Sequence, residues 1–291
     1  MTTSLIGCHA LVWTGVFDRA GVTESVTRTR QAGFDLIEFP LMEPDTFDVA
    51  AARKALADTG LTATASLGLP AHADISADDP EVVAAGSQML TRALEVTAEI
   101  GGTHLCGVLY GAMRKHSAPM TEHGLANSIE TLRDIADRAE SLGIELAIEV
   151  VNRYETNMIN TGRQALRYLD ALDRRVSVHL DTYHMNIEEP DLFQPFLDCR
   201  DRLGYVHIGE SHRGYLGTGS VDFDSCFKSL SRIGYTGPIV FESFSSAVVS
   251  PSLSHTLGIW RNLWQDSDDL AGHAHRFIRD HLHATATIAL H

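Results

Sequence analysis

Short apolar runs with the composition of strands alternate with longer helix-like segments along the whole chain, and this alternation limits the fold most strongly. Eight runs read as strands: 5–11, 35–40, 62–68, 103–109, 145–151, 176–182, 205–210 and 238–243. Parallel strands need a crossover connection of about a dozen or more residues, usually a helix, and the segments between the runs can supply it. The pattern predicts an α/β fold, a single (β/α)₈ TIM barrel, with function on the loops after the strands.

The segments between the expected strands carry the start and stop signals of helices. Asp48 is placed to cap the start of one helix and Gly60 to end it, and Asp222 is placed to cap a later one. No linker or low-complexity stretch divides the chain, so we expect one domain over residues 1–291. A doubly wound open sheet is the alternative, but no GxGxxG motif follows the first expected strand.

Near the ends of the last four expected strands lie four residues that can bind a divalent metal: Glu149, Asp181, His207 and Glu242. The gaps of 32, 26 and 35 residues between them each match one strand–loop–helix unit. Alternation along the strands points all four to one face, and their neighbours in the strands are apolar. A parallel strand buried on both faces offers a carboxylate no favourable place unless its charge is compensated, and a metal ion does this best.

Three carboxylates and one imidazole form a hard, oxygen-rich set of donors. Such a set suits Mn²⁺ first, with Mg²⁺ or Co²⁺ as further candidates, better than a metal that prefers thiolates. Four protein ligands leave about two octahedral positions for water or for two neighbouring oxygens of a sugar. The sequence therefore predicts a divalent metal centre at the mouth of the barrel.

The net charge of −15, from 38 acidic and 23 basic residues, argues against several kinds of partner. A field of this sign repels nucleic-acid phosphates and anionic membranes, and gives little reason to expect a phosphorylated substrate. The four cysteines show no CxxC pairing, and neither a leader-like start nor an apolar run of 18 residues occurs. We therefore expect a cytoplasmic enzyme that binds neither nucleic acid nor a membrane.

Several strings in the sequence carry a family resemblance: IEVVNRYETN, HLDTYHMNIEE, VHIGESHRGYLGTG and VFESF, supported by GCHALVW, AGFDLIEFP, SLGLP and NTGRQALRYL. They resemble the ketose 3-epimerases, the D-tagatose and D-allulose (D-psicose) 3-epimerase group of the xylose-isomerase-like barrels. The resemblance implies metal-dependent, reversible epimerisation of free ketoses at carbon 3, with D-fructose and D-allulose as the leading pair. D-tagatose, D-sorbose and L-ribulose are further candidates, and a homodimer or homotetramer is implied as well.

The resemblance also implies roles for individual residues. It assigns the metal to the four residues above, and gives Glu149 and Glu242 the further role of acid–base pair. It implies contacts with the substrate oxygens near carbons 1 to 3 for residues after expected strands five, six and seven: Glu155, His184 in the loop after strand six, and Arg213. Two residues after expected strand one are further candidates for substrate binding, namely His9, where several relatives carry an aromatic residue, and Trp13 as a wall for the sugar.

The chemistry of a ketose supports an acid–base pair independently of the resemblance. The proton on carbon 3 lies next to a carbonyl but is too weakly acidic for an unaided carboxylate, and a divalent ion stabilises the enediolate that its removal leaves. Inversion then needs a base on one face and an acid on the other, and Glu149 and Glu242 come from strands three places apart. Arg213 offers a permanently charged fork suited to orienting an oxyanion.

Three other functions remain open at this stage. An aldose–ketose isomerase, or an enzyme like hydroxypyruvate isomerase, would use the same metal and the same carboxylate pair. A metal-dependent nucleic-acid repair enzyme would call for more histidine ligands and a basic face, which the net charge opposes. A sugar-binding barrel without activity would have no need of two opposed glutamates.

Overall fold

The computed structural model describes residues 4–288. Within them, eight parallel strands pair in chain order and close into a barrel: β1 Ile6–His9, β2 Leu36–Pro40, β3 Thr62–Ser66, β4 His104–Gly107, β5 Glu145–Val150, β6 Ser177–Asp181, β7 Leu203–Ile208 and β8 Ile239–Phe241. The predicted TIM barrel is therefore confirmed. The extent of the domain, 1–291, stays a prediction because residues 1–3 and 289–291 lie outside the described residues.

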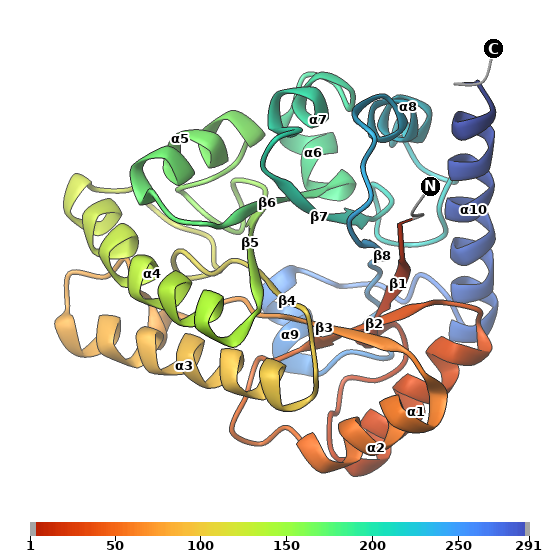
Figure 1. Cartoon of the computed structure of the whole chain (residues 1–291), viewed down its shortest axis with the longest axis horizontal. Coiled ribbons are helices and arrows are strands. Elements are labelled where there is room, and N and C mark those ends of the chain that lie inside the picture. The colour runs from red at the N-terminus through yellow and green to blue at the C-terminus, as the bar shows by residue number, and fades with distance from the viewer. Residues whose placement is uncertain (1–3, 289–291) are drawn as a thin grey trace.

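Helices surround the strands, as Figure 1 shows. The α-helices are α1 Arg19–Gln31, α2 Val49–Thr59, α3 Pro80–Glu99, α4 Glu122–Leu142, α5 Gly162–Leu172, α6 Thr182–Glu188, α7 Gln194–Cys199, α8 Phe223–Ile233, α9 Pro251–Leu257 and α10 Ser267–Ile288, and two short 3₁₀ helices cover Ala10–Val12 and Ala71–Ala73. Helix α10 contacts α8, β1 and β8, so it covers the seam where the barrel closes.

Side-chain caps explain why these helices begin and end where they do. The Asp48 side chain accepts a hydrogen bond from the backbone N–H of Ala51, and Gly60 ends the same helix with φ of 71°. The Asp222 side chain likewise caps α8 through the N–H of Ser225. All three signals were predicted, and all three are confirmed. A short helix, α6, was not predicted: His184 lies in it and not in a loop, which corrects the sequence-based placement.

The two faces of the barrel strands differ in polarity. Their outer faces pack against the helices in one large apolar core. The inside of the barrel holds only a small apolar group, made of Leu36, Cys106, Ala147, Tyr205 and Val240. Other inward positions carry buried polar side chains, among them Glu38, Thr64 and His179. TIM-barrel interiors are dominated by branched apolar residues, so this interior is unusually polar.

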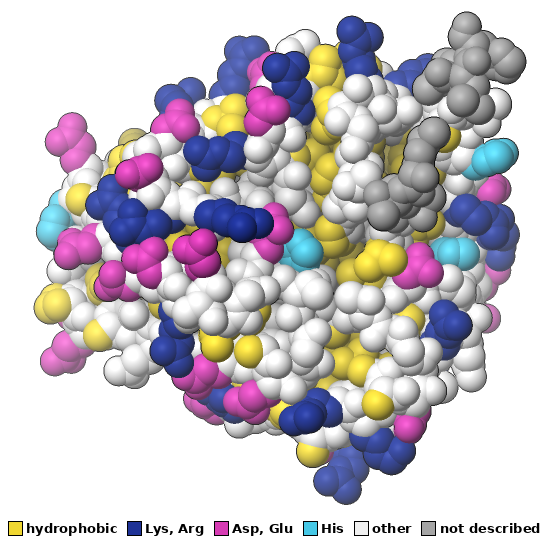
Figure 2. Space-filling model, viewed as in Figure 1, with side chains coloured by type: hydrophobic (Ala, Val, Ile, Leu, Met, Phe, Trp, Pro, Cys, Tyr) yellow, Lys and Arg dark blue, Asp and Glu magenta, His cyan; other side chains and the backbone are white. Residues whose placement is uncertain are grey.

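Residues 4–288 contain no helix suited to a membrane, and the face drawn in Figure 2 shows no charged platform. None of the described helices combines the length and the apolar character that crossing a bilayer requires. On the face shown in Figure 2, basic and acidic side chains are interspersed and do not gather in a single patch.

Candidate active site and metal centre

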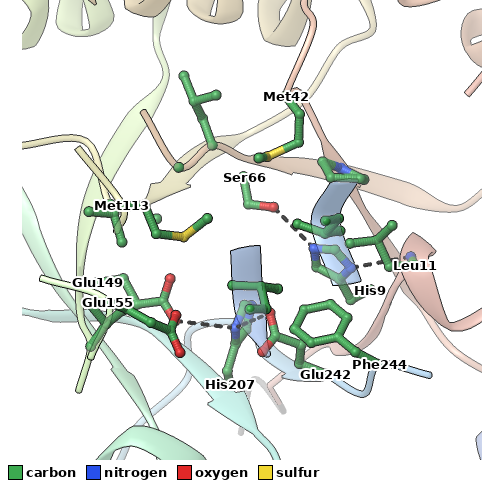
Figure 3. Close-up of a pocket in the computed structure, with 18 of the residues that line it drawn as sticks. His9, Leu11, Met42, Ser66, Met113, Glu149, Glu155, His207, Glu242 and Phe244 are labelled. Atoms are coloured by element: carbon green, nitrogen blue, oxygen red, sulfur yellow. Dashed lines mark hydrogen bonds and ion pairs between the residues drawn. The ribbon is translucent and has the colours of Figure 1, made fainter. Parts of the chain in front are cut away.

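The four predicted metal ligands meet at the carboxyl ends of the last four strands. Glu149 lies in β5, Asp181 ends β6, His207 lies in β7, and Glu242 directly follows β8. Asp181 and His207 are partners in the β6–β7 register, and the ligand atoms of Glu149, Asp181 and His207 lie within 4.8 Å of one another. His207 Nδ1 is 3.4 Å from Glu242 Oε1 and 3.9 Å from Glu149 Oε1. Figure 3 shows the two glutamates on either side of His207.

Unpartnered polar atoms show that this cluster fits a cation. Asp181 Oδ2 and His207 Nδ1 are fully buried, and neither has a hydrogen-bond partner within the part of the chain that the structure describes. Burying such atoms without a partner costs about 1–3 kcal/mol each. A divalent ion between the carboxylates and the imidazole would satisfy both atoms and compensate the acidic charge.

The pKa values of the cluster reflect burial together with crowding of like charges. Burial, followed by the charges of Glu242 and Asp181, raises the pKa of Glu149 well above its usual value. Burial and the charge of Glu242 raise the pKa of Asp181 to about 7. Burial alone lowers the pKa of His207, but the carboxylates of Glu38 and Glu242 outweigh it and raise the pKa to about 10. Without a metal, the His207 proton compensates part of the acidic charge.

Arg213 lies beside Glu242 and is held from several directions. Its Nη1 donates to Glu242 Oε2 over 2.8 Å, and its guanidinium lies 4.0 Å from the ring centre of Tyr183 and 4.5 Å from that of Phe244. Burial lowers the pKa of Arg213, but the charges of Glu242 and Glu155 outweigh it and keep the pKa above its usual value. The backbone of Arg213 has φ of 58°, a left-handed conformation uncommon for a non-glycine residue.

His184 and Glu155 complete the polar side of the cavity. His184 Nδ1 accepts a hydrogen bond from the backbone N–H of Asn152 over 3.1 Å, and its Nε2 lies 3.6 Å from Glu149 Oε1. Glu155 Oε1 accepts from the Asn152 amide over 2.9 Å and lies 3.8 Å from Arg213 Nη2. Burial lowers the pKa of His184 and raises that of Glu155. The structure therefore brings Glu155, His184 and Arg213 together with the four predicted ligands.

The opposite side of the cavity is mostly apolar. Figure 3 shows Leu11, Met42 and Met113 there, with His9 and Ser66 as a polar pair, while Phe244 lies beside Glu242. His9 Nε2 lies 3.2 Å from Ser66 Oγ, and His9 Nδ1 accepts from the backbone N–H of Leu11 over 3.2 Å. His9 thus lines the cavity, as expected of a substrate-binding candidate.

Trp13 does not line this cavity, which corrects its predicted place as a wall for the sugar. Its indole N–H donates to Thr29 Oγ1 over 2.8 Å, and the Arg28 guanidinium lies 4.8 Å from its ring centre. The side chain therefore contacts α1, from the position that directly follows the 3₁₀ helix after β1. Leu11 and Phe244 contribute the wall instead.

Several residues of the site were not predicted from the sequence: Met42, Ser66, Met113, Tyr183 and Phe244. Their positions at or just after strand ends were a usable signal, because function in this fold lies on the loops there. The apolar side chains among them carried no signal of their own, since an apolar residue after a strand looks the same in sequence whether it lines a cavity or packs in the core.

A family model described as xylose isomerase-like TIM barrel matches residues 26–281 of the chain. The chain is 62% identical over 287 residues to a ketose 3-epimerase of Arthrobacter globiformis, a match that covers 98% of this chain and 99% of the relative. It is 51% identical to an L-ribulose 3-epimerase of Methylomonas sp., over 94% of this chain and 96% of that one. A solved D-allulose 3-epimerase from Methylomonas sp., in complex with D-allulose, superposes with a TM-score of 0.94 at 50% identity, covering 97% of this chain and 98% of the other.

Proposed function

Because the chain belongs to the xylose isomerase-like TIM barrel family and, within it, to the ketose 3-epimerases, we propose that it epimerises free ketoses at carbon 3 with a divalent metal. The observation that carries the metal dependence is the convergence of Glu149, Asp181 and His207 on one buried point, with unpartnered atoms on two of them. Glu242 would be the fourth ligand. Mn²⁺ is the proposed ion, with Mg²⁺ or Co²⁺ as alternatives, because the donor set is mostly oxygen.

The polar side of the cavity would bind the end of the ketose that reacts. Arg213 can donate to an oxygen near carbon 1 or 2 from a guanidinium already fixed by Glu242 and two aromatic rings. His184 and Glu155 can hold the hydroxyl groups beside it, since each is oriented by Asn152. When bound, the metal supplies Lewis-acid stabilisation of the negative charge that develops on the ketose oxygens.

Glu149 and Glu242 would carry the proton. One carboxylate takes the proton from carbon 3, and the electron pair of that C–H bond moves towards the carbonyl at carbon 2. The other glutamic acid returns a proton to the opposite face of carbon 3, which inverts that centre and restores the carbonyl. Their placement on either side of His207 suits such a transfer across a substrate bound between them (Figure 3). The direction of reaction decides which of the two acts as base.

The choice of sugar is part of the proposal. D-fructose and D-allulose remain the leading pair, and L-ribulose is added at equal rank because a relative at 51% identity is an L-ribulose 3-epimerase. The apolar wall of Leu11, Met42 and Met113 offers few specific contacts to the far end of the sugar, so both ketohexoses and ketopentoses should fit. A homodimer or homotetramer and a cytoplasmic location stay predictions.

The test is to incubate the Mn²⁺-loaded protein with D-fructose, D-allulose or L-ribulose in ²H₂O, separate the products and locate deuterium by NMR. We expect 3-epimers with deuterium at carbon 3. An aldose labelled at carbon 2, without a 3-epimer, would instead establish an aldose–ketose isomerase. Protein stripped of metal with a chelator should be inactive, and restoration by Mn²⁺ should exceed restoration by Zn²⁺.

A further inference from the structure

Glu38 is a buried carboxylate to which the proposed function gives no role. It lies in the middle of β2, has no exposed surface, and points into the barrel beside His9, its register partner in β1. It belongs to the half of the barrel that carries none of the four predicted ligands. A buried ionised carboxylate is costly unless it is well paired, so its partners show what it does.

The two Glu38 oxygens contact three side chains. Oε2 accepts from His207 Nε2 over 2.8 Å and from the Tyr205 hydroxyl over 2.7 Å. The Tyr205 hydroxyl also lies 2.7 Å from Thr64 Oγ1, so the donors run in one direction, from Thr64 through Tyr205 to the carboxylate. Oε1 lies 3.4 Å from His9 Nε2.

These contacts decide which nitrogen of His207 faces the metal centre. Glu38 Oε2 lies at hydrogen-bond distance from both the Tyr205 hydroxyl and His207 Nε2, and a carboxylate oxygen in this position accepts from both, so Nε2 of His207 carries a hydrogen. Nδ1 is then the nitrogen that lies 3.4 Å from Glu242 and 3.9 Å from Glu149, and it is fully buried without a hydrogen-bond partner in residues 4–288. Ring orientation and tautomer therefore both depend on Glu38, from across the barrel.

We propose that Glu38 is a positioning residue of the metal centre: it fixes the His207 ring so that Nδ1, and not Nε2, is the ligand atom. The proposal rests on the proposed metal site. A carboxylate that accepts from the second nitrogen of a ligating histidine orients the ring and raises its basicity, and loss of such a partner typically costs about 10–100-fold in metal affinity. Tyr205 is the second donor that holds the carboxylate in this orientation.

The decisive substitution is Glu38→Gln, which keeps the shape of the side chain. A neutral amide lacks the negative charge that raises the basicity of the His207 ring. If its oxygen keeps the His207 and Tyr205 donors, its NH₂ group takes the place of Oε1 and meets the N–H of His9 Nε2, 3.4 Å away, so donor faces donor. We expect Mn²⁺ to bind about 10–100-fold more weakly, measured by calorimetry and by the EPR signal of free Mn²⁺. The matched variant Tyr205→Phe keeps the His207–Glu38 bond and should weaken binding by no more than about fivefold.

Two readouts separate positioning from general destabilisation. Thermal unfolding curves recorded without metal should show that both variants are folded at the assay temperature. The kcat of Glu38→Gln should be closer to that of the unsubstituted protein at saturating Mn²⁺ than at limiting Mn²⁺. The proposal would be overturned by a folded Glu38→Gln protein whose Kd for Mn²⁺ lies within about twofold of that of the unsubstituted protein.

A measurement on the unsubstituted protein covers the case in which Glu38→Gln does not fold. With ¹⁵N-labelled histidine, addition of diamagnetic Mg²⁺ should shift Nδ1 of His207 while Nε2 keeps its hydrogen. Mg²⁺ bound through Nε2, with the hydrogen on Nδ1, would contradict the inference but leave the proposed function intact. Failure of the unsubstituted protein to bind either Mn²⁺ or Mg²⁺ would instead overturn the metal centre itself, so the two failures are distinguishable.

Discussion

The two halves of the barrel mouth differ in what their strands present to the cavity. At or just after the carboxyl ends of β5 to β8 lie Glu149, Asp181, His207 and Glu242, all of them buried and able to bind a metal. At the corresponding ends of β1 to β4 lie His9, Pro40, Ser66 and Gly107. The half formed by β5 to β8, called the first half below, therefore offers charge. The half formed by β1 to β4, called the second half, offers shape and a few hydrogen bonds.

In the proposed function, this difference separates chemistry from selectivity within one cavity. Proton transfer needs groups held at fixed distances in a buried, highly charged setting, and β5 to β8 supply them. Recognition of the far end of a sugar needs a surface that can vary, and the apolar residues after β1, β2 and β4 supply that: Leu11, Met42 and Met113. Glu38 is the exception: it lies in the second half, contacts His207 of the first half, and in our proposal orients its ring.

The largest expected effect comes from Glu149→Gln and Glu242→Gln, which test whether the first half carries the chemistry. Each should lower kcat by about 10²–10⁴-fold, because each removes a proton-transfer group. Exchange of the carbon 3 proton with ²H₂O should fall in parallel. Glu145→Gln, the same change at the other end of β5, is the control and should stay near full activity. Normal turnover by either active-site variant would remove the acid–base pair from the first half.

Arg213→Lys should have the next largest effect. Lysine cannot stack between Tyr183 and Phe244 while bonding Glu242, and charge-assisted hydrogen bonds contribute about 1.5–3 kcal/mol, so kcat/KM should fall about 10–100-fold. Steady-state kinetics with D-fructose and L-ribulose measure it. Arg153→Lys, at an exposed arginine paired with Glu188, is the control. An equal loss of kcat/KM in both variants would mean that the substitution lowers the stability of the protein in general and does not act at the site.

Much of the first half could be predicted from the sequence, and little of the second. A glutamate, aspartate or histidine inside an apolar strand is conspicuous, and strand alternation fixes the face it points to, which is why Glu149 and its three partners could be named. Glu38 gave the same signal in LIEFP, but the next expected strand, 62–68, offers no ligand to join it in a metal cluster. The error over Trp13 has another cause: this residue directly follows a 3₁₀ helix of three residues that no sequence pattern marked, and its indole bonds to α1.

The pH dependence of metal binding tests the charge of the first half as a unit. In the metal-free protein Asp181, with its pKa raised to about 7, binds a proton below that pH, and His207, with its pKa raised to about 10, keeps a proton at neutral pH. Metal binding must displace these protons, so Mn²⁺ affinity should fall as pH falls, by about tenfold per pH unit for each proton displaced. Calorimetry in buffers of different ionisation enthalpy counts the protons. If Mn²⁺ bound without releasing protons both above and below pH 7, Asp181 and His207 would not be the metal ligands.

The smallest expected effect lies in the second half, at Ser66. Ser66→Ala removes the hydroxyl that His9 Nε2 contacts over 3.2 Å, but His9 keeps its bond from the Leu11 N–H and its contact with Glu38, so its ring should stay in place. A neutral hydrogen bond contributes about 1 kcal/mol, so we expect KM to change by no more than about fivefold and kcat to be nearly unchanged. The informative quantity is the ratio of kcat/KM for D-fructose to that for L-ribulose, since a wall that reads the far end of the sugar alters this ratio without altering the chemistry. A loss of kcat as large as that of Arg213→Lys would mean that Ser66 takes part in catalysis, and that catalysis is not confined to the first half.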